Sequence, residues 1–148
     1  MDKPIRGSVE AMIQIATAEI GYHEGKDNAT KYQTAHQPWC GAFLNFCSDA
    51  NGIKHPDVTS TIAGASAFKK AGKWFDTDPR PGDFAFFDFI DDGVTKIQHI
   101  ELVVKVSEGA VVTIGGNVSD AVKLSTHKLG AHSVIVGYGR PDYRTETK

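Results

Sequence analysis

The sequence is poor in cysteine, in net charge and in long apolar stretches, and each shortage excludes a class of protein. Its two cysteines, Cys40 and Cys47, are too few for a disulfide framework and lack the CxxC spacing of a zinc site. A net charge of -2 offers no basic surface for nucleic acid or an anionic membrane. No apolar run approaches the roughly 20 residues that span a bilayer. We therefore expect neither a nucleic-acid partner nor a membrane partner.

The N-terminal segment, MDKPIRGSVEAMIQIATAEIGY, also lacks the long apolar core and the small-residue cleavage site of a secretory signal. We expect synthesis in a host cytoplasm without a signal peptide, so that action outside the cell needs a separate route of release. The chain has 148 residues, of which 41% are hydrophobic, which suffices for one domain with its own core. We predict a single domain over residues 1–148.

Apolar residues recur at helical spacing in the first half of the chain and alternate in the second half. The helical pattern predicts helices over residues 8–20, 40–50 and 62–71. The alternating, β-branched pattern predicts strands near 83–89, 98–106, 110–116 and 132–138, with a short one near 121–126. Helices first and antiparallel strands afterwards indicate an α+β fold. Cys40 and Cys47 would lie about 10 Å apart on one helix, too far for a disulfide, so we expect free thiols.

Cys40 stands where the second predicted helix begins. Pro38 fixes the backbone just before it, which places Cys40 in the first turn. There the free backbone N–H groups and the helix dipole favour a thiolate and could stabilise an oxyanion. The alternative is a buried core thiol, which cysteine statistics alone favour. Cys47, within the apolar stripe of Phe43 and Phe46, is expected to be such a core residue.

A thiol nucleophile needs a base, which is usually histidine. In IQHIELVVKV, Ile100, Leu102 and the following even positions form an apolar strand face, so His99 and Glu101 point to the other face. A rigid strand is a suitable mount for a base. The other five histidines fall in predicted loops or beside turns, where a solvated side chain is the usual outcome; His127 is one of those beside a turn.

The base needs a partner that orients its second ring nitrogen. Asn117 ends the strand that follows the predicted turn at 106–110, and it lies as far after that turn as His99 lies before it. An antiparallel hairpin can therefore bring Asn117 toward His99. Alone, Asn117 is better explained as a left-handed turn residue after two glycines. Together with Cys40 and His99, it is the candidate orienting residue.

The order of these three residues resembles that of the papain-like amidases. The sequence is similar to a CHAP domain (cysteine, histidine-dependent amidohydrolase/peptidase), close to the NlpC-type enzymes, and most similar to the CHAP domains of phage endolysins, which cut peptidoglycan peptides. Seven blocks between about residues 10 and 143 carry the resemblance: AEIGYHEG (18–25), NATKY (28–32), PWCGAFLNFC (38–47), PRPGDFAFFDF (79–89), QHIELVV (98–104), TIGGN (113–117) and VGYGRPDY (136–143).

The resemblance implies a papain-like α+β fold, with N-terminal helices packed on an antiparallel sheet. It implies Cys40 as nucleophile, His99 as base and Asn117 as the orienting residue. It further implies a peptidoglycan hydrolase that cuts a peptide or amide bond of the stem or crossbridge. We expect bacterial peptidoglycan as the partner, no cofactor and a monomer that reaches the wall after release through a holin.

The sequence departs from the family at two positions. Many relatives carry Glu where Gly115 stands, and that acid would help to hold the histidine. Relatives usually have Gly or Ala where Glu101 stands, about 7 Å along the strand from His99. Either Glu101 partly replaces the missing carboxylate or contacts a cationic part of the substrate, or it is a solvated edge carboxylate.

A papain-like site also needs a second oxyanion donor upstream of the nucleophile. Tyr32, Gln33 and Gln37 are the candidates, and the sequence does not choose between them. Trp39 could form the wall of the groove or belong to the core. Some CHAP domains bind calcium in the loop before the nucleophile, but here that loop offers only Glu24 and Asp27, short of the roughly six oxygen ligands required. A second acidic patch, at Asp88, Asp91 and Asp92, is more typical of a solvated hairpin tip, and no required metal is predicted.

Two other functions remain open at this point. A catalytically weakened papain-like domain could bind cell walls without cutting them, and the missing carboxylate at Gly115 gives this some support. Alternatively, a cysteine peptidase or amidase could act on a substrate outside the wall. An activated Cys40 would react fast with an alkylating reagent near neutral pH, and a buried one would not.

Overall fold

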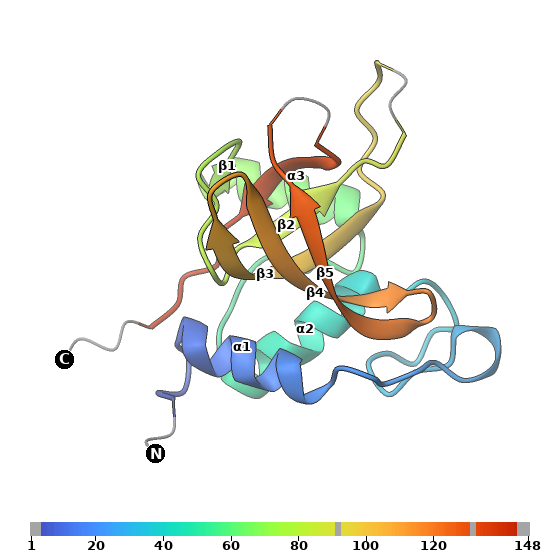
Figure 1. The fold of residues 1–148 in the computed structure, drawn as a ribbon. Helices are drawn as coiled ribbons and strands as arrows, with labels where there is room; N and C mark the ends of the chain where they lie inside the picture. The colour runs from blue at the N-terminus through green and yellow to red at the C-terminus, as the bar shows by residue number, and fades with distance from the viewer. Residues whose placement is uncertain (1–3, 91–92, 131–132, 145–148) are drawn as a thin grey trace.

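The structure is a computed structural model, and it describes residues 4–90, 93–130 and 133–144. In these residues, three α-helices precede an antiparallel sheet whose strands are ordered β1-β6-β2-β3-β4-β5 (Figure 1). The elements are α1 (Val9–Ala18), the 3-10 turn η1 (Lys26–Asn28), α2 (Cys40–Asn51), α3 (Thr61–Lys70), β1 (Trp74–Phe75), β2 (Phe84–Phe87), β3 (His99–Ser107), β4 (Ala110–Val118), β5 (Ala121–Lys128) and β6 (Ile135–Gly139). The α+β prediction is confirmed; η1 and β1 were not predicted.

Local sequence explains where the helices begin and end. The Ser8 hydroxyl accepts a hydrogen bond from the backbone N–H of Ala11 at the start of α1, and Ser60 does the same at the start of α3. Helix α2 begins at Cys40 after Trp39, whose backbone is not helical, and ends at Gly52 in the left-handed conformation (φ 72°). The predicted second helix is therefore correct to within one residue.

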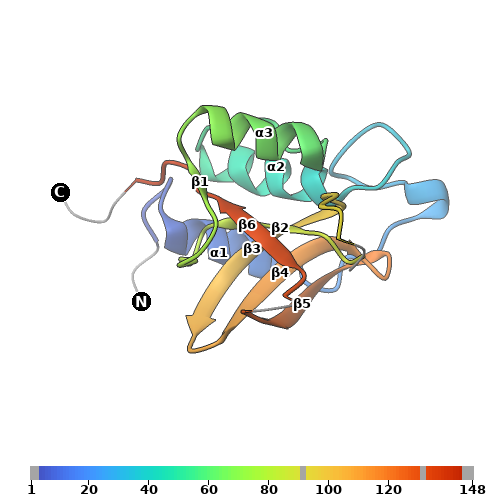
Figure 2. The same ribbon diagram turned by 90° about the horizontal axis from the view of Figure 1, so that it is seen from above.

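The main core lies between the helices and one face of the sheet. Helix α2 packs on β3 and β4, and α1 packs against α2 (Figures 1 and 2). Phe43 and Leu44 of α2 are fully buried, as are Ile100 and Leu102 of β3. The predicted apolar face of the strand is thus buried at its start, next to the beginning of α2.

The opposite face of the sheet is also partly buried, so the sheet does not have one buried face and one face exposed to solvent. Ala85, Phe87, Val103, Val111 and Tyr138 form a second apolar cluster there. This is the face onto which β3 directs Glu101 and Val103, and both side chains are buried. A charged side chain in this position needs partners, because an unpaired buried charge is costly.

The PRPGD segment builds one such partnered charge. The Asp83 carboxylate is 1% exposed and accepts two hydrogen bonds from Arg140, from Nε at 2.8 Å and from Nη2 at 2.9 Å. It also accepts a hydrogen bond from the backbone N–H of Arg80. The pair joins the turn before β2 to the end of β6 and so fixes the middle of the sheet.

Candidate active site

Cys40 is the first residue of α2. The first intrahelical hydrogen bond runs from the Phe43 N–H to the Trp39 carbonyl, at 3.0 Å, so the N–H groups before it have no partner within the helix. Close packing fixes this helix start, because a Cβ on Gly41 would lie 1.8 Å from the Val58 carbonyl oxygen. Cys40 is 7% exposed and is held at the helix start, where the first N–H groups have no partner within the helix.

His99 is the first residue of β3, and Cys40, at the start of α2, lies close enough to its imidazole to raise the pKa of His99. Its Nε2 lies 2.7 Å from Oε2 of Glu101, so the ring nitrogen that remains for other contacts is Nδ1. Burial alone would lower the pKa of His99, but the contacts with Cys40 and Glu101 outweigh burial and raise it to about 9. The imidazole is therefore held as a cation near neutral pH.

Glu101 is 2% exposed and uses both carboxylate oxygens. Oε2 contacts His99, and Oε1 accepts a hydrogen bond of 2.5 Å from the Thr113 hydroxyl of β4. Oε1 also lies 3.6 Å from Nε2 of His127 in β5, which is too long for a hydrogen bond. Burial would raise the pKa of Glu101, but these neighbours (His127, His99 and Thr113) hold it at about 2. The alternative of a solvated edge carboxylate is wrong.

Gly115 provides the space that Glu101 fills. The β3–β4 register pairs Leu102 with Ile114 and Val103 with Thr113, so its continuation sets Glu101 opposite Gly115. A Cβ on Gly115 would lie 2.4 Å from Cγ of Glu101, 2.5 Å from Cδ and 2.7 Å from Oε2. The two departures from the family pattern, Gly at position 115 and Glu at position 101, therefore lie next to each other in the sheet.

The same register sets Asn117 opposite His99, as the predicted hairpin required. However, the strand is irregular here: the pairing of β4 with β5 shifts after Gly115, and Asn117 has a left-handed backbone (φ 59°). Its side chain lines the same hollow as His99 but makes no hydrogen bond to the imidazole among the described residues. The structure therefore brings Asn117 close to His99, while the ring contact comes from Glu101.

Two hollows flank the Cys40–His99 pair. One, of about 370 Å³, lies on the Cys40 side; the other, of about 250 Å³, lies on the His99 side. The first is lined by Gln37, Pro38, Cys40, Thr59, Ser60, Thr61, Ile62 and Gln98. The second is lined by Phe89, His99, Glu101, Asn117, Val118, Ser125 and His127. One hollow therefore adjoins Cys40, and the other adjoins His99.

The structure places the candidate oxyanion and groove residues in different environments. Tyr32 donates its hydroxyl to Glu19, and the side-chain amide of Gln33 donates to the Gln37 carbonyl. Of the three candidates, Gln37 lines the hollow beside Cys40. Trp39 is fully buried and stacks on Tyr32 at 5.5 Å, so it belongs to the core and does not form the wall of the groove.

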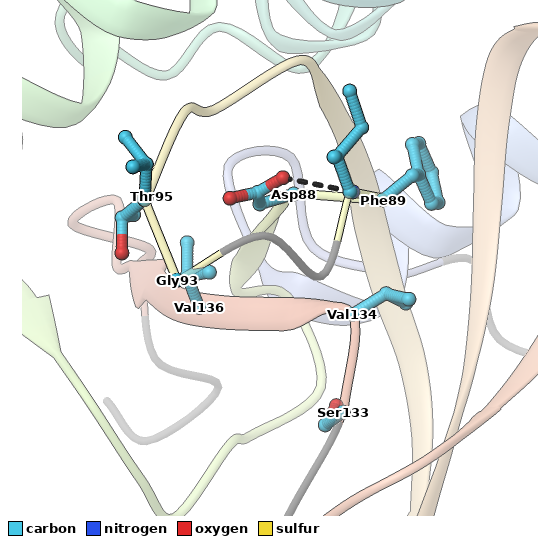
Figure 3. Close-up of a pocket in the computed structure, with 9 residues that line it drawn as sticks. Asp88, Phe89, Gly93, Thr95, Ser133, Val134 and Val136 are labelled. Carbon is cyan, nitrogen blue, oxygen red and sulfur yellow. Dashed lines mark hydrogen bonds between the residues drawn. The ribbon is translucent and has the colours of Figure 1, made fainter.

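A third hollow, of about 250 Å³, lies between the segment after β2 and the start of β6 (Figure 3). The Asp88 carboxylate accepts hydrogen bonds there from the backbone N–H groups of Ile90 and Lys96. Phe89 lines this hollow and also the one beside His99. Cys40 does not line it, so it lies outside the candidate site.

Cys40 and Cys47 are both free, as predicted, and burial raises the pKa of the Cys47 thiol.

Within residues 4–90, 93–130 and 133–144, no three His, Cys, Asp or Glu side chains are grouped so that they could hold a metal ion. Asp91 and Asp92, part of the predicted acidic patch, lie outside the described residues. None of the helices in the described part of the chain is long and apolar enough to cross a membrane.

His127 is the residue that the sequence argument missed. Its Nε2 is buried and has no hydrogen-bond partner among the residues that the structure describes, and its ring packs 4.8 Å from Phe87, which also packs against His99. The alternation of β5 relative to β4 could have placed it near Glu101, since Val111 pairs with His127 and Thr113 with Ser125. That deduction needs the β4–β5 register, which the sequence pattern did not define.

No family model and no curated protein sequence matches the chain. Among solved structures, it is similar to a protein described as similar to a lipoprotein of the NLP/P60 family, from Staphylococcus aureus subsp. aureus Mu50. The TM-score is 0.52 at 15% sequence identity, and the match covers 92% of this chain and 42% of the other. The chain thus has the papain-like fold of an NLP/P60 protein and spans less than half of that protein's length.

Proposed function

We propose that the protein is an endolysin-type peptidoglycan hydrolase of the CHAP kind, which cuts a peptide or amide bond of the wall stem or crossbridge. The observation that supports this best is the contact between Cys40, at the start of α2, and His99, whose pKa is raised to about 9. Once the thiol proton has passed to the imidazole, the Cys40 thiolate and the His99 imidazolium form the ion pair from which thiol acyl transfer begins. The papain-like fold agrees with this chemistry.

In the proposed mechanism, the Cys40 thiolate attacks the carbonyl carbon and forms a C–S bond. The backbone N–H of Cys40 donates to the developing oxyanion, and Gln37 is the proposed second donor. The imidazolium of His99 gives its proton to the leaving amine as the C–N bond breaks, which leaves a thioester. His99 then takes a proton from water, whose oxygen attacks the thioester and releases the acid and the thiol.

The two hollows divide the substrate around this reaction. Because His99 must reach the leaving nitrogen, the amine product lies over the hollow that Phe89, Asn117 and Val118 help to line. The acyl part lies over the hollow beside Gln37 and Ile62. Asn117, whose side chain lines the first of these, stays a proposed contact to the imidazole or to the leaving group. The choice of peptidoglycan rests on the resemblance of the sequence blocks to endolysin CHAP domains.

Replacing the nucleophile tests the proposal. Cys40→Ala should abolish lysis of purified cell walls while the protein stays folded, because no other thiol contacts His99 in the described residues. Cys47→Ala is the matched control: it removes a buried thiol of the same helix, and lysis should persist. Mass spectrometry of the wall fragments identifies the bond. Full lysis by Cys40→Ala would exclude the proposal.

The two alternatives give different results in the same assay. A weakened module would bind walls without releasing fragments, and Cys40 would alkylate slowly. A peptidase or amidase with another substrate would show fast alkylation of Cys40 and no lysis.

A further inference from the structure

The carboxylate of Glu101 is fixed at two points before it reaches His99. Oε1 accepts the Thr113 hydroxyl of β4, and Oε2 contacts Nε2 of His99, so the carboxylate cannot turn without breaking one contact. From β4 to α2, the chain of contacts runs through Thr113, Glu101, His99 and Cys40. We propose that Glu101 is the positioning residue of His99: from the strand of the histidine itself, it orients the imidazole for proton exchange with Cys40. This inference rests on the proposed function.

Packing around Gly115 supports this assignment independently of the hydrogen bonds. The Glu101 side chain occupies the position that a Cβ at residue 115 would take, with its carboxylate carbon 2.5 Å from that point. Only glycine leaves room for the carboxylate at this register position, because any Cβ would displace it. The carboxylate of Glu101 therefore takes the space that an acid at position 115 would use in the relatives. The site keeps a carboxylate, which comes from residue 101 instead of residue 115.

The surroundings exclude water from this carboxylate. Glu101 is 2% exposed, and the ring of Phe87 packs against both neighbouring imidazoles, at 5.5 Å from His99 and 4.8 Å from His127. In such a low-dielectric position, an anion stabilises an adjacent cation much more strongly than it does in water. Glu101 thus both aims the ring and favours its protonated form.

The test is the pH dependence of Cys40 alkylation by iodoacetate, whose own carboxylate is attracted by a protonated His99. In the intact protein, the rate should fall as pH rises through about 9, where His99 loses its proton. Glu101→Gln keeps the shape and removes the charge, so this fall should move to lower pH by one unit or more. Wall lysis should slow roughly 10²-fold, as expected for a mispositioned base. Glu108→Gln, at an exposed turn position, is the matched control and should change neither measurement.

Two further variants keep the test informative if Glu101→Gln folds poorly. Thr113→Val removes one fixed point and should move the fall in the same direction by a smaller amount. The exchange variant Glu101→Gly with Gly115→Asp should recover alkylation and lysis lost in Glu101→Gly alone, because an aspartate Cβ at 115 would lie 2.7 Å from the present Oε2. The alkylation measurement needs no wall substrate, so it separates this proposal from the proposed function.

Unchanged alkylation and lysis profiles in Glu101→Gln would overturn the inference, even if Cys40→Ala abolished lysis. Conversely, persistent lysis by Cys40→Ala would exclude the proposed function, whatever the alkylation profile showed.

Discussion

Asp83 and Glu101 are both buried carboxylates of the same sheet, and they differ in what they are paired with. Asp83 faces Arg140, whose guanidinium donates two hydrogen bonds and stays charged at every ordinary pH. Glu101 faces His99 and His127, and the His99 ring can lose or gain a proton within the ordinary pH range because its pKa is about 9. The first pair is a permanent link between strand ends, whereas the second responds to pH and to the chemistry of Cys40.

The partners of these two carboxylates show how a buried charge can be assigned a structural or a functional role. Burial and hydrogen bonding alone do not separate the two, because Asp83 is 1% exposed and Glu101 is 2% exposed. The partner separates them: the Arg140 contact joins the turn before β2 to the end of β6, while the His99 contact continues to a thiol in a surface hollow.

The largest predicted effect is on stability, from removing the permanent pair. Asp83→Ala leaves the Arg140 charge without its partner and should lower the free energy of unfolding by about 3–5 kcal/mol. The rate of Cys40 alkylation per folded molecule should be unchanged, because in the described part of the chain the Asp83 side chain hydrogen-bonds only Arg80 and Arg140. Urea denaturation followed by alkylation at low denaturant measures both.

A surface pair serves as the matched control for this change. Asp142 contacts Lys73 at 2.8 Å, and both side chains are largely exposed. Asp142→Asn should change the free energy of unfolding by less than about 1 kcal/mol. If the two variants were equally destabilised, the Asp83–Arg140 link would not be the structural anchor described here.

The next prediction uses pH to distinguish the two pairs. The pKa of His99 is raised to about 9 in the folded protein, above its ordinary value of 6.5. Its stabilising contribution is therefore complete below about pH 6.5 and is lost as pH rises through 9. The pKa of Glu101 is lowered to about 2, so its share is complete above about pH 4.5 and is lost as pH falls through 2. The free energy of unfolding should be highest near pH 5–6 and should fall by up to roughly 3 kcal/mol toward pH 9.

Urea titrations between pH 5 and pH 9.5 check this slope in two variants. In His99→Gln the fall toward pH 9 should disappear, because the titrating partner is gone. In Asp83→Ala the free energy of unfolding should be lower at every pH, but it should fall by the same amount toward pH 9, because Arg140 does not titrate in this range. A fall that persisted in His99→Gln would have to come from another group.

The sequence predicted the elements of the site better than its contacts. Helix α2 and strands β3 and β4 were correctly placed, because apolar periodicity and the glycine at 52 define their limits. Continuing the pairs Val103–Thr113 and Leu102–Ile114 sets His99 opposite Asn117, as the hairpin predicted, but the ladder reaches this register through an irregularity between Val103 and Lys105 that the spacing did not predict. The limits of the elements depend on local spacing along the chain, which a sequence displays directly.

The contacts depended on features that spacing does not display. Asn117 has the left-handed backbone that the alternative interpretation required, and the pairing is irregular after Gly115, so being opposite His99 does not give Asn117 a hydrogen bond to the imidazole among the described residues. The open space at Gly115 admits Glu101, and the burial of the second sheet face removes that carboxylate from solvent. Both require the curvature and the outer layer of the folded sheet, so the sequence could only suggest Glu101 as one of several possibilities.

The smallest predicted effect compares the two histidines beside Glu101. Nε2 of His127 is buried without a hydrogen-bond partner among the described residues and lies 3.6 Å from Oε1, whereas Nε2 of His99 lies 2.7 Å from Oε2. His127→Leu removes this unsatisfied buried group but also a neighbour that lowers the pKa of Glu101, so the two effects oppose each other and the free energy of unfolding should change by less than about 1 kcal/mol. The alkaline fall of Cys40 alkylation should shift less than in Thr113→Val, and Ser125→Ala in the same hollow is the control. A loss of more than about 2 kcal/mol would instead make His127 a true ionic partner, as Arg140 is for Asp83. Glu101 would then be held by three groups and only partly available to His99.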